Sequence, residues 1–388
     1  MLAAPPASRT SRPSSRESAP QGPHEPEYTV SVVDSLTRWA ELAKDWNDLL
    51  GQSWANVVFL TWEWLYTWAE CFWSAGAELF ILTVSRGGEL VGVAPWCIQR
   101  RSWGLVTVRQ IEFLGASGAD SDYLDVFARR GEEKEIARCI YDFLFHEASS
   151  RWETLALLDI PADSLFLLHL LNDIAEDGKH VEIQPGAFCP IVQLPTTQAE
   201  FMASLSPHRR AQVTRHERLL QRAGKVEHVT TTTRDGLDTS ALDALYALYP
   251  WKSGTEKAQF HRFLQRFLTR AGGRDWVQVD LLTVDAKPVA GLFHLRSGVT
   301  LFQYLLTADK TAYPKTSVGN LLIGFCLQKA IADDFAEYDI LRGSEDYKFH
   351  WATGGRRSLS IRLYQRRPSA FLLVGFESIK ALLKVLLR

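Results

Sequence analysis

The residues best suited to chemistry lie between positions 301 and 351. A short apolar and aromatic run, LFQYLL, predicts a buried strand, and the turn TSVG after it opens a helix. In this turn Ser317 can cap the first helical amides, and Gly319 lets a ligand approach the backbone closely. Because a helix start presents free N–H groups and the positive end of a dipole, this pattern is typical of an anion-binding site.

A polar run follows the next predicted strand, YDIL. It reads Arg342, Gly343, Ser344, Glu345, Asp346, Tyr347 and Lys348. Carboxylates, a phenol and a guanidinium at the end of one core strand can transfer protons and bind charged groups. The same residues also have structural interpretations, as helix caps, ion pairs or a core tyrosine, and the sequence leaves both open.

Composition limits the classes of protein. The chain has 388 residues, 46% hydrophobic and 23% charged, which predicts two or three globular domains. A net charge of −2 gives no global electrostatic case for nucleic acid. The cysteines are odd in number, widely spaced and without a CxxC pair, which favours reduced thiols in a cytoplasmic protein over disulfides or a metal site: Cys71, Cys97, Cys139, Cys189 and Cys326.

Both ends of the chain differ from its middle. Residues 1–27 are rich in Pro, Ser and Arg and predict a disordered tail. Residues 368–388 predict an amphipathic helix, which would pack on the protein or lie on a membrane surface. No stretch has the roughly 20 apolar residues of a transmembrane helix. A helix opened by Pro207 carries a local basic cluster: Arg209, Arg210, Arg215, Arg218 and Arg222.

The chain also contains an internal repeat. ILTVSRGGELVGVAPW (81–96) parallels LLTVDAKPVAGLFHL (281–295), and later segments match in the same order. This predicts two duplicated α/β units with mixed sheets, at residues 28–178 and 179–367. The second copy has TSVGN at its helix start, whereas the first has the acidic GEEKE, which would repel an anion. We therefore expect the functional site in the second copy, with the first copy structural or substrate-shaping.

These motifs resemble a known family. The run PVAGLFHLRSGVTLFQYLLTAD…TSVGNLLIGFCLQKA…YDILRGSEDYKFHW closely resembles the CelD/BcsL-type (BioF2-like) branch of the GNAT N-acyltransferases, which is associated with polysaccharide biosynthesis. The FemAB-like transferases, which also contain two tandem GNAT units, are related. The resemblance covers about residues 30–365 and implies a tandem GNAT-like fold. The loop that binds pyrophosphate in this superfamily usually carries several glycines, whereas this chain has only Gly319 there, so the sequence departs from the family pattern in this loop.

The resemblance implies an acyltransferase (acetyltransferase) that uses acetyl-CoA or another acyl-CoA and an amine or hydroxyl acceptor. The alternatives are an aminoacyl transferase of FemAB type, the only one with a tRNA partner, and a non-catalytic binding protein. The pyrophosphate would lie at the helix start, and strand amides would hold the thioester carbonyl. The implied cofactor-binding residues are Leu305, Leu306, Thr307, Ser317, Val318, Gly319 and Asn320.

The resemblance also implies catalytic and substrate-binding roles for the polar run at residues 342–348. Tyr347 would protonate the leaving thiolate, and Glu345 would accept the acceptor's proton. Arg342 completes the expected catalytic set: it would pair with a phosphate or a substrate carboxylate, or form an ion pair with Asp339 or Glu345 that shapes the site, and we favour the ion pair. Asp346, Lys348 and Trp351 are the expected substrate-binding residues; capping, solvation and core packing are their structural alternatives.

Overall fold

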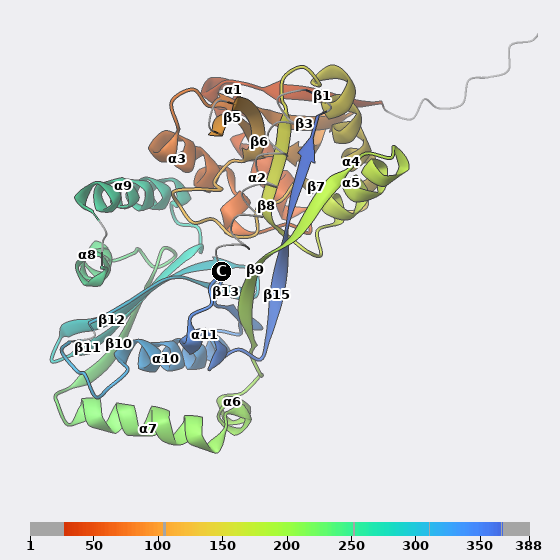
Figure 1. Ribbon diagram of the computed structural model, residues 1–388. Helices are drawn as coiled ribbons and strands as arrows, with labels where there is room; N and C mark the ends of the chain where they lie inside the picture. Colours follow the sequence, from red (N-terminus) through yellow and green to blue (C-terminus); the bar gives the residue numbers. More distant parts are fainter. Residues whose placement is uncertain (1–26, 104–105, 251–252, 310, 366, 368–388) are drawn as a thin grey trace, which may run out of the picture.

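The computed structural model describes residues 27–103, 106–250, 253–309, 311–365 and 367. The predicted N-terminal tail, apart from residue 27, and the predicted C-terminal helix lie outside the described residues. The described chain forms two lobes, the first half of the sequence in the upper one and most of the second half in the lower one (Figure 1).

The first half begins with β1 and three helices that carry tryptophans inward. Asp34 is a residue type that favours a helix start and the sequence predicts it as the cap, but Ser35 caps the first helix, because its hydroxyl accepts the N–H of Arg38. Trp39, Trp46 and Trp64 are fully buried, as their helical spacing predicts. The elements of this half are β1 (Tyr28–Val33), α1 (Leu36–Glu41), α2 (Ala43–Gly51), η1 (Val58–Leu60), α3 (Trp62–Phe72), β2 (Glu78–Leu79), β3 (Ile81–Arg86), β4 (Glu89–Ala94), β5 (Trp96–Trp103), β6 (Val106–Phe113), β7 (Phe127–Ala128), α4 (Glu133–Asp142), the π-helical turn η2 (Phe143–Glu147), β8 (Thr154–Pro161) and α5 (Leu165–Glu176).

The second half repeats the plan of a hairpin, a strand, a helix and a further strand. Its elements are β9 (Val181–Gln193), α6 (Gln198–Ser204), α7 (Pro207–Gln221), β10 (Val226–Thr232), α8 (Thr239–Leu248), α9 (Gly254–Ala271), β11 (Val277–Val284), β12 (Lys287–Ser297), β13 (Thr300–Ala308), α10 (Val318–Ala332), β14 (Glu337–Asp339), α11 (Asp346–Phe349) and β15 (Gly354–Tyr364). Helix α9 packs against the first half, where the rings of Phe263 and Phe267 meet Trp64 edge-on.

The strands form two sheets. A four-stranded sheet has the order β1-β3-β4-β7, and an eleven-stranded sheet has the order β10-β11-β12-β13-β14-β9-β15-β8-β6-β5-β2. The pairs β13/β14 and β6/β8 are parallel, and the other recorded pairs are antiparallel. The predicted mixed α/β class, with two duplicated units, is confirmed.

Two long strands join the lobes. β15, near the end of the described chain, pairs with both β8 of the first half and β9, and β9 in turn pairs with β14 (Figure 1). The sequence of this segment, VEIQPGAFCPIVQLP, predicts two short strands, and that prediction is wrong, since residues 181–193 form the single strand β9. The strand continues past Pro185 because the register of β9 and β15 shifts there, between the pairs Arg357/Phe188 and Leu359/Pro185. The division at residues 178/179 falls between α5 and β9 and stays a proposal.

Candidate active site

The start of α10 is open to a ligand. Among the described residues, no acceptor is recorded for the backbone N–H groups of Gly319 and Asn320. The prediction that Ser317 caps this helix is wrong: its hydroxyl accepts Nδ2–H of Asn320 at 3.1 Å, and its backbone N–H donates to Nδ1 of His216 at 3.2 Å. Burial, aided by Arg215 and Arg209, lowers the pKa of His216, which favours the neutral ring that can accept this bond. The free amides of α10 therefore remain available to an anion.

The strands beside this helix separate. β13 pairs with β14 only from Thr300 to Phe302, so the rest of β13 has no partner strand on that side. The register of β12 and β13 shifts at the same level, where Leu305 faces Phe293 and Gln303 faces His294, leaving Tyr304 as the extra residue of a bulge. The gap between the strands exposes one edge of β13 to a ligand.

A cavity of about 940 Å³ joins the helix start to the strand gap. Ten of the predicted site residues line it: Leu305, Leu306, Ser317, Val318, Gly319, Asn320, Arg342, Glu345, Tyr347 and Lys348. Thr307 is buried within β13, and Asp346 is exposed on α11. A Cβ on Gly319 would lie 3.5 Å from Cβ of Ala308, which is an ordinary van der Waals contact. An alanine would therefore fit at this position, but a larger side chain would fill the space beside the helix start.

Tyr347 reaches the cavity from α11. Its hydroxyl accepts Nε2–H of Gln303 at 3.2 Å, and burial, with the charge of Glu345, raises its pKa to about 12. The phenol therefore stays protonated at neutral pH and has its own O–H left to donate.

Lys348 has a different role from the one predicted. It is buried, and its Nζ donates to the carbonyl oxygens of Arg342 at 2.5 Å and Leu341 at 3.3 Å. These bonds hold a turn in which Leu341 has φ of 55° and Gly343 has φ of 146°, conformations that cost a non-glycine residue energy. Lys348 thus shapes the turn that presents Arg342.

The remaining predicted residues divide between surface and core. Glu345 is exposed, lies 3.4 Å from Nζ of Lys348 and makes no side-chain cap to α11. Trp351 is buried outside the main cavity: its Nε1–H donates to Asn320 Oδ1 at 3.3 Å, and the guanidinium of Arg209 lies over its ring at 5.4 Å. The core interpretation of Trp351 therefore applies, with an indirect effect on the helix start.

Arg342 forms ion pairs, but with partners that the sequence did not predict. Its guanidinium lies 3.3 Å from Asp122, 3.5 Å from Asp159 and 3.8 Å from Asp120, all in the first half. The expected partner Asp339 instead lies 3.3 Å from Arg356. The first half thus supplies carboxylates to the cavity of the second.

Asp122 is the buried member of this group. Burial raises its pKa to about 7, although the charge of Arg342 opposes the shift. Asp120, two residues before it, and Tyr123, directly after it, have φ of 44° and 56°, so the loop around Asp122 adopts an unfavourable backbone conformation. The hydroxyl of Tyr304 fixes the loop to β13 by donating to the carbonyl oxygen of Ala119 at 2.5 Å.

Among the lining residues that sequence reasoning missed, five carry polar groups from other elements: Asp120, Asp122, His216, Tyr249 and Gln303. The available signal was the Gly- and Asp-rich run GASGADSDY after a strand of the first half, which by itself predicts only a connection between two strands. Two of these residues come from the first half, and no spacing rule connects them with positions more than 200 residues away.

The equivalent helix start in the first half is occupied by acids. α4 carries Glu133 and Glu135 in its first turn, and the cap residue Glu132 pairs with Arg86 at 3.1 Å. A second cavity, of about 590 Å³, lies at this place and includes Glu133 and Asp125 in its lining. Negative charge at a helix start disfavours an anion.

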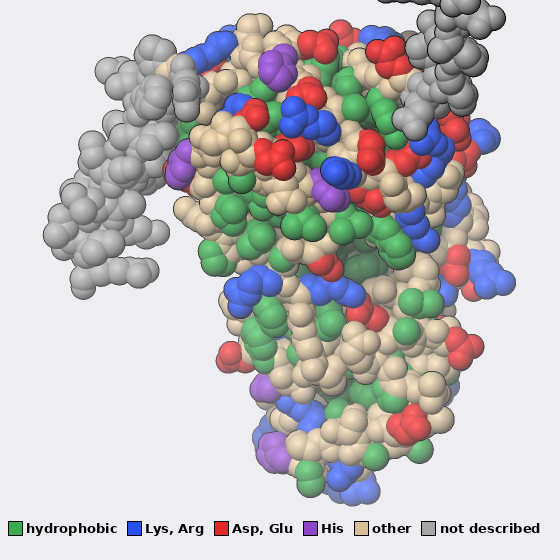
Figure 2. Space-filling model, turned by 90° about the vertical axis from the view of Figure 1, so that its right-hand side faces the viewer, with side chains coloured by type: hydrophobic (Ala, Val, Ile, Leu, Met, Phe, Trp, Pro, Cys, Tyr) green, Lys and Arg blue, Asp and Glu red, His purple; other side chains and the backbone are tan. Residues whose placement is uncertain are grey.

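The face turned to the viewer in Figure 2 shows hydrophobic side chains and a hollow where the two lobes meet. Within the described ranges, no helix is both long and apolar enough to cross a membrane.

Comparison with known proteins agrees with this geometry. Residues 207–349 match the family model described as an acetyltransferase (GNAT) domain. A search of curated proteins finds no match. Among solved structures, one titled as the crystal structure of FemX has a TM-score of 0.54 at 13% identity and covers 85% of this chain and 98% of its own.

Two further structures are less similar. A tandem GNAT protein from the clavulanic acid biosynthesis pathway has a TM-score of 0.45 at 13% identity, covering 86% of this chain and 98% of its own. The C-terminal domain of a putative lysylphosphatidylglycerol synthetase from Agrobacterium fabrum has a TM-score of 0.49 at 10% identity, with 87% and 95% covered. Residues 207–349 thus match the model of a GNAT acetyltransferase domain, and the solved structure titled FemX shares the overall fold of the chain.

Proposed function

We propose that the protein transfers an acyl group, acetyl in the simplest case, from acyl-CoA to an amine or hydroxyl acceptor, in polysaccharide or cell-envelope biosynthesis. One observation carries the proposal: a single cavity connects the open start of α10 with Tyr347, Arg342 and Asp122. The amides of Gly319 and Asn320 bind the pyrophosphate of the donor, and the thioester lies along the free edge of β13.

The cavity supplies an acid and a base. Tyr347 stays protonated and donates to the leaving thiolate. For the base, Asp122 is better suited than Glu345, because a pKa near 7 matches the working pH and a buried carboxylate has little competing water. Arg342 keeps enough positive charge beside Asp122 for ionisation to occur near neutral pH.

The alternative donor is aminoacyl-tRNA, as the resemblance to FemAB-like transferases implies. The basic helix α7 would be its contact surface. Two of its arginines already have partners within the chain: Arg209 lies over Trp351, and Arg210 donates to the carbonyl oxygen of Met202 at 2.9 Å. These contacts leave the charge of both arginines in place but hold their guanidinium groups against the protein, which leaves fewer of them free to contact RNA, and we favour acyl-CoA.

A binding panel tests the proposal. The wild-type protein is titrated with acetyl-CoA, longer acyl-CoAs, CoA and aminoacyl-tRNA, and binding is measured by calorimetry. Acceptor mixtures of amino sugars and nucleotide sugars are then analysed by mass spectrometry for an added acyl mass. We expect acyl-CoA binding that Gly319→Val weakens and Gly319→Ala does not. No binding of any acyl-CoA at millimolar concentration would refute the proposal, and binding without transfer would favour a non-catalytic protein.

A further inference from the structure

A line of buried side chains runs from the cavity to a carboxylate on the far strands. The hydroxyl of Tyr347 accepts from Nε2 of Gln303 at 3.2 Å, and Oε1 of Gln303 accepts the O–H of Tyr338 at 3.0 Å. The same Tyr338 oxygen lies 2.9 Å from Nε2 of His294, whose Nδ1 lies 3.0 Å from Oδ2 of Asp280. His294, Tyr338 and Asp280 have no exposed surface, so water does not interrupt the line.

Asp280 fixes the charge at the far end. Its Oδ1 accepts from Thr230 at 2.6 Å and lies 2.8 Å from His228 Nε2, while Oδ2 accepts from Gln278 at 2.8 Å and faces His294. Burial alone would raise the pKa of Asp280, but hydrogen bonds and charge from the two histidines hold it well below its usual range. Asp280 is therefore a carboxylate and only accepts hydrogen bonds.

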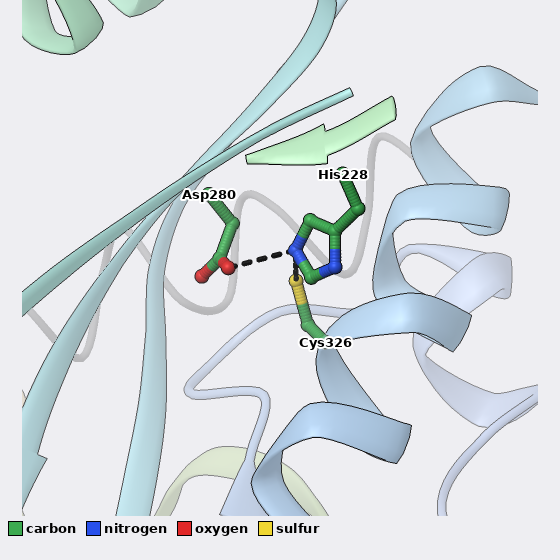
Figure 3. Close-up of side chains that lie close together, drawn as sticks. All are labelled: His228, Asp280 and Cys326. Carbon is green, nitrogen blue, oxygen red and sulfur yellow. Dashed lines mark hydrogen bonds and ion pairs between the residues drawn. The ribbon is translucent and has the colours of Figure 1, made fainter. Parts of the chain in front are cut away.

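Figure 3 shows Asp280 together with His228 and Cys326. Nε2 of His228 lies 2.8 Å from Asp280 Oδ1 and 3.9 Å from Sγ of Cys326. Both contacts use one ring nitrogen, whereas a nucleophile–histidine–carboxylate relay uses both. Burial also holds the pKa of the Cys326 thiol well above its ordinary value. Cys326 is thus no activated nucleophile, and His228 serves Asp280 as a hydrogen-bond donor.

Counting protons fixes the state of His294. Nδ1 must carry a proton, because a bare lone pair 3.0 Å from a carboxylate oxygen would be repelled. Tyr338 has one proton and gives it to Gln303, so the contact between Tyr338 and Nε2 needs a proton from His294 as well. Both ring nitrogens are then protonated, and the imidazolium is paired with Asp280.

A neutral His294 would reverse the donor and acceptor roles along this chain of hydrogen bonds. Its Nε2 would take the proton of Tyr338, and the amide of Gln303 would have to turn over to donate to Tyr338. The amide oxygen would then face Tyr347 and accept its O–H. In that arrangement the proton of Tyr347 points away from the cavity.

We propose that His294, paired with Asp280, is a positioning residue that acts through Tyr338 and Gln303 to direct the O–H of Tyr347 into the cavity. This inference rests on the proposed function, in which Tyr347 protonates the leaving thiolate. The chain of hydrogen bonds sets the donor and acceptor direction of each neighbour, and no proton moves along it, because the amide of Gln303 does not relay protons as a hydroxyl does. The other ionisable groups around the pair are His228 and Cys326 across Asp280, and Arg296, which reaches the network by donating to Gln278 at 3.3 Å.

The first test does not depend on activity. The wild-type protein is labelled with ¹⁵N-histidine, and His294→Gln identifies the His294 signals. We expect two protonated ring nitrogens for His294 at pH 7. A neutral ring with one N–H at that pH would overturn the inference, whether or not the protein transfers acyl groups. An imidazolium in a protein without transfer activity would instead refute the proposed function.

The second test compares two matched variants with steady-state kinetics. His294→Gln and His228→Gln each remove an imidazole from Asp280, but only His294 lies on the line to Tyr347. We expect His294→Gln to lower kcat about 10-fold or more, with KM for acyl-CoA within about 2-fold, and His228→Gln to retain wild-type kcat. Equal losses in the two variants would contradict the inference.

Gln303→Glu provides a test if His294→Gln does not fold. A carboxylate there only accepts, so it would withdraw the proton of Tyr347, and kcat should fall as far as in Tyr347→Phe. Adding Gln303→Glu to Tyr347→Phe should then cost nothing more. A further multiplicative loss in the double variant would show that Gln303 acts by another route and would overturn the inference.

Discussion

Arg342 is the cation that links the two halves at the cavity, and Arg342→Met tests this link most directly. The guanidinium faces Asp122, Asp159 and Asp120, of which only Asp122 is buried. Methionine keeps most of the apolar stem and removes the charge. The variant therefore leaves a buried carboxyl without its partner.

The cost should depend on pH. The folded pKa of Asp122, about 7, exceeds its value of 3.8 in a model peptide, so ionising it weakens the fold as pH rises from about 4 to 7. Without Arg342 the folded pKa rises further, and that loss continues above pH 7 at about 1.4 kcal/mol per pH unit. At pH 5 the carboxyl is protonated in both proteins, and only about 0–1 kcal/mol is lost from the exposed pairs. At pH 9 we expect an additional loss of about 2–3 kcal/mol.

Urea unfolding of wild type and Arg342→Met at pH 5, 7 and 9 measures this difference. Arg357→Met is the matched control, since it removes an exposed arginine that lies over Phe188, outside the cavity. Adding Asp122→Asn should remove the pH dependence of Arg342→Met. A loss that is the same at all three pH values would refute the reasoning about Asp122.

The other predictions concern the cavity directly. Tyr347→Phe should lower kcat about 10²-fold or more with little change in donor KM, and an unchanged kcat would show that Tyr347 is not the acid. The wild-type rate should show no loss from tyrosine ionisation below about pH 10, because the pKa of the phenol is about 12. Gly319→Val should weaken acetyl-CoA binding by filling the space beside Ala308 and Leu306, whereas Gly319→Ala should not. Calorimetry measures both affinities, and equal effects would be evidence against a donor site there. Lys348→Met should lower the free energy of unfolding, measured with urea, by about 1–3 kcal/mol, because two backbone carbonyls lose their donor. An unchanged stability would show that the turn at Arg342 does not need Lys348.

Local patterns predicted much of the fold. The helical spacing of Trp39, Trp46 and Trp64 identified their buried face, and the shared order of segments in the two halves predicted the duplication. Errors occurred where tertiary contacts override local signals. Ser317 was expected to cap α10, but the nearby His216 and Asn320 use its hydrogen-bonding groups instead.

The sequence by itself determined the elements, the duplicated plan and the half in which a helix start stays free of acids, because these depend on neighbours within one turn or one hairpin. Only the tertiary structure decided which groups meet in the cavity. The buried partner of Arg342, Asp122, lies in a loop more than 200 residues earlier. Tyr347, on helix α11, depends on four buried side chains that lie on four different strands. Such contacts follow from how β9 and β15 join the two units into one sheet, and no local spacing encodes that.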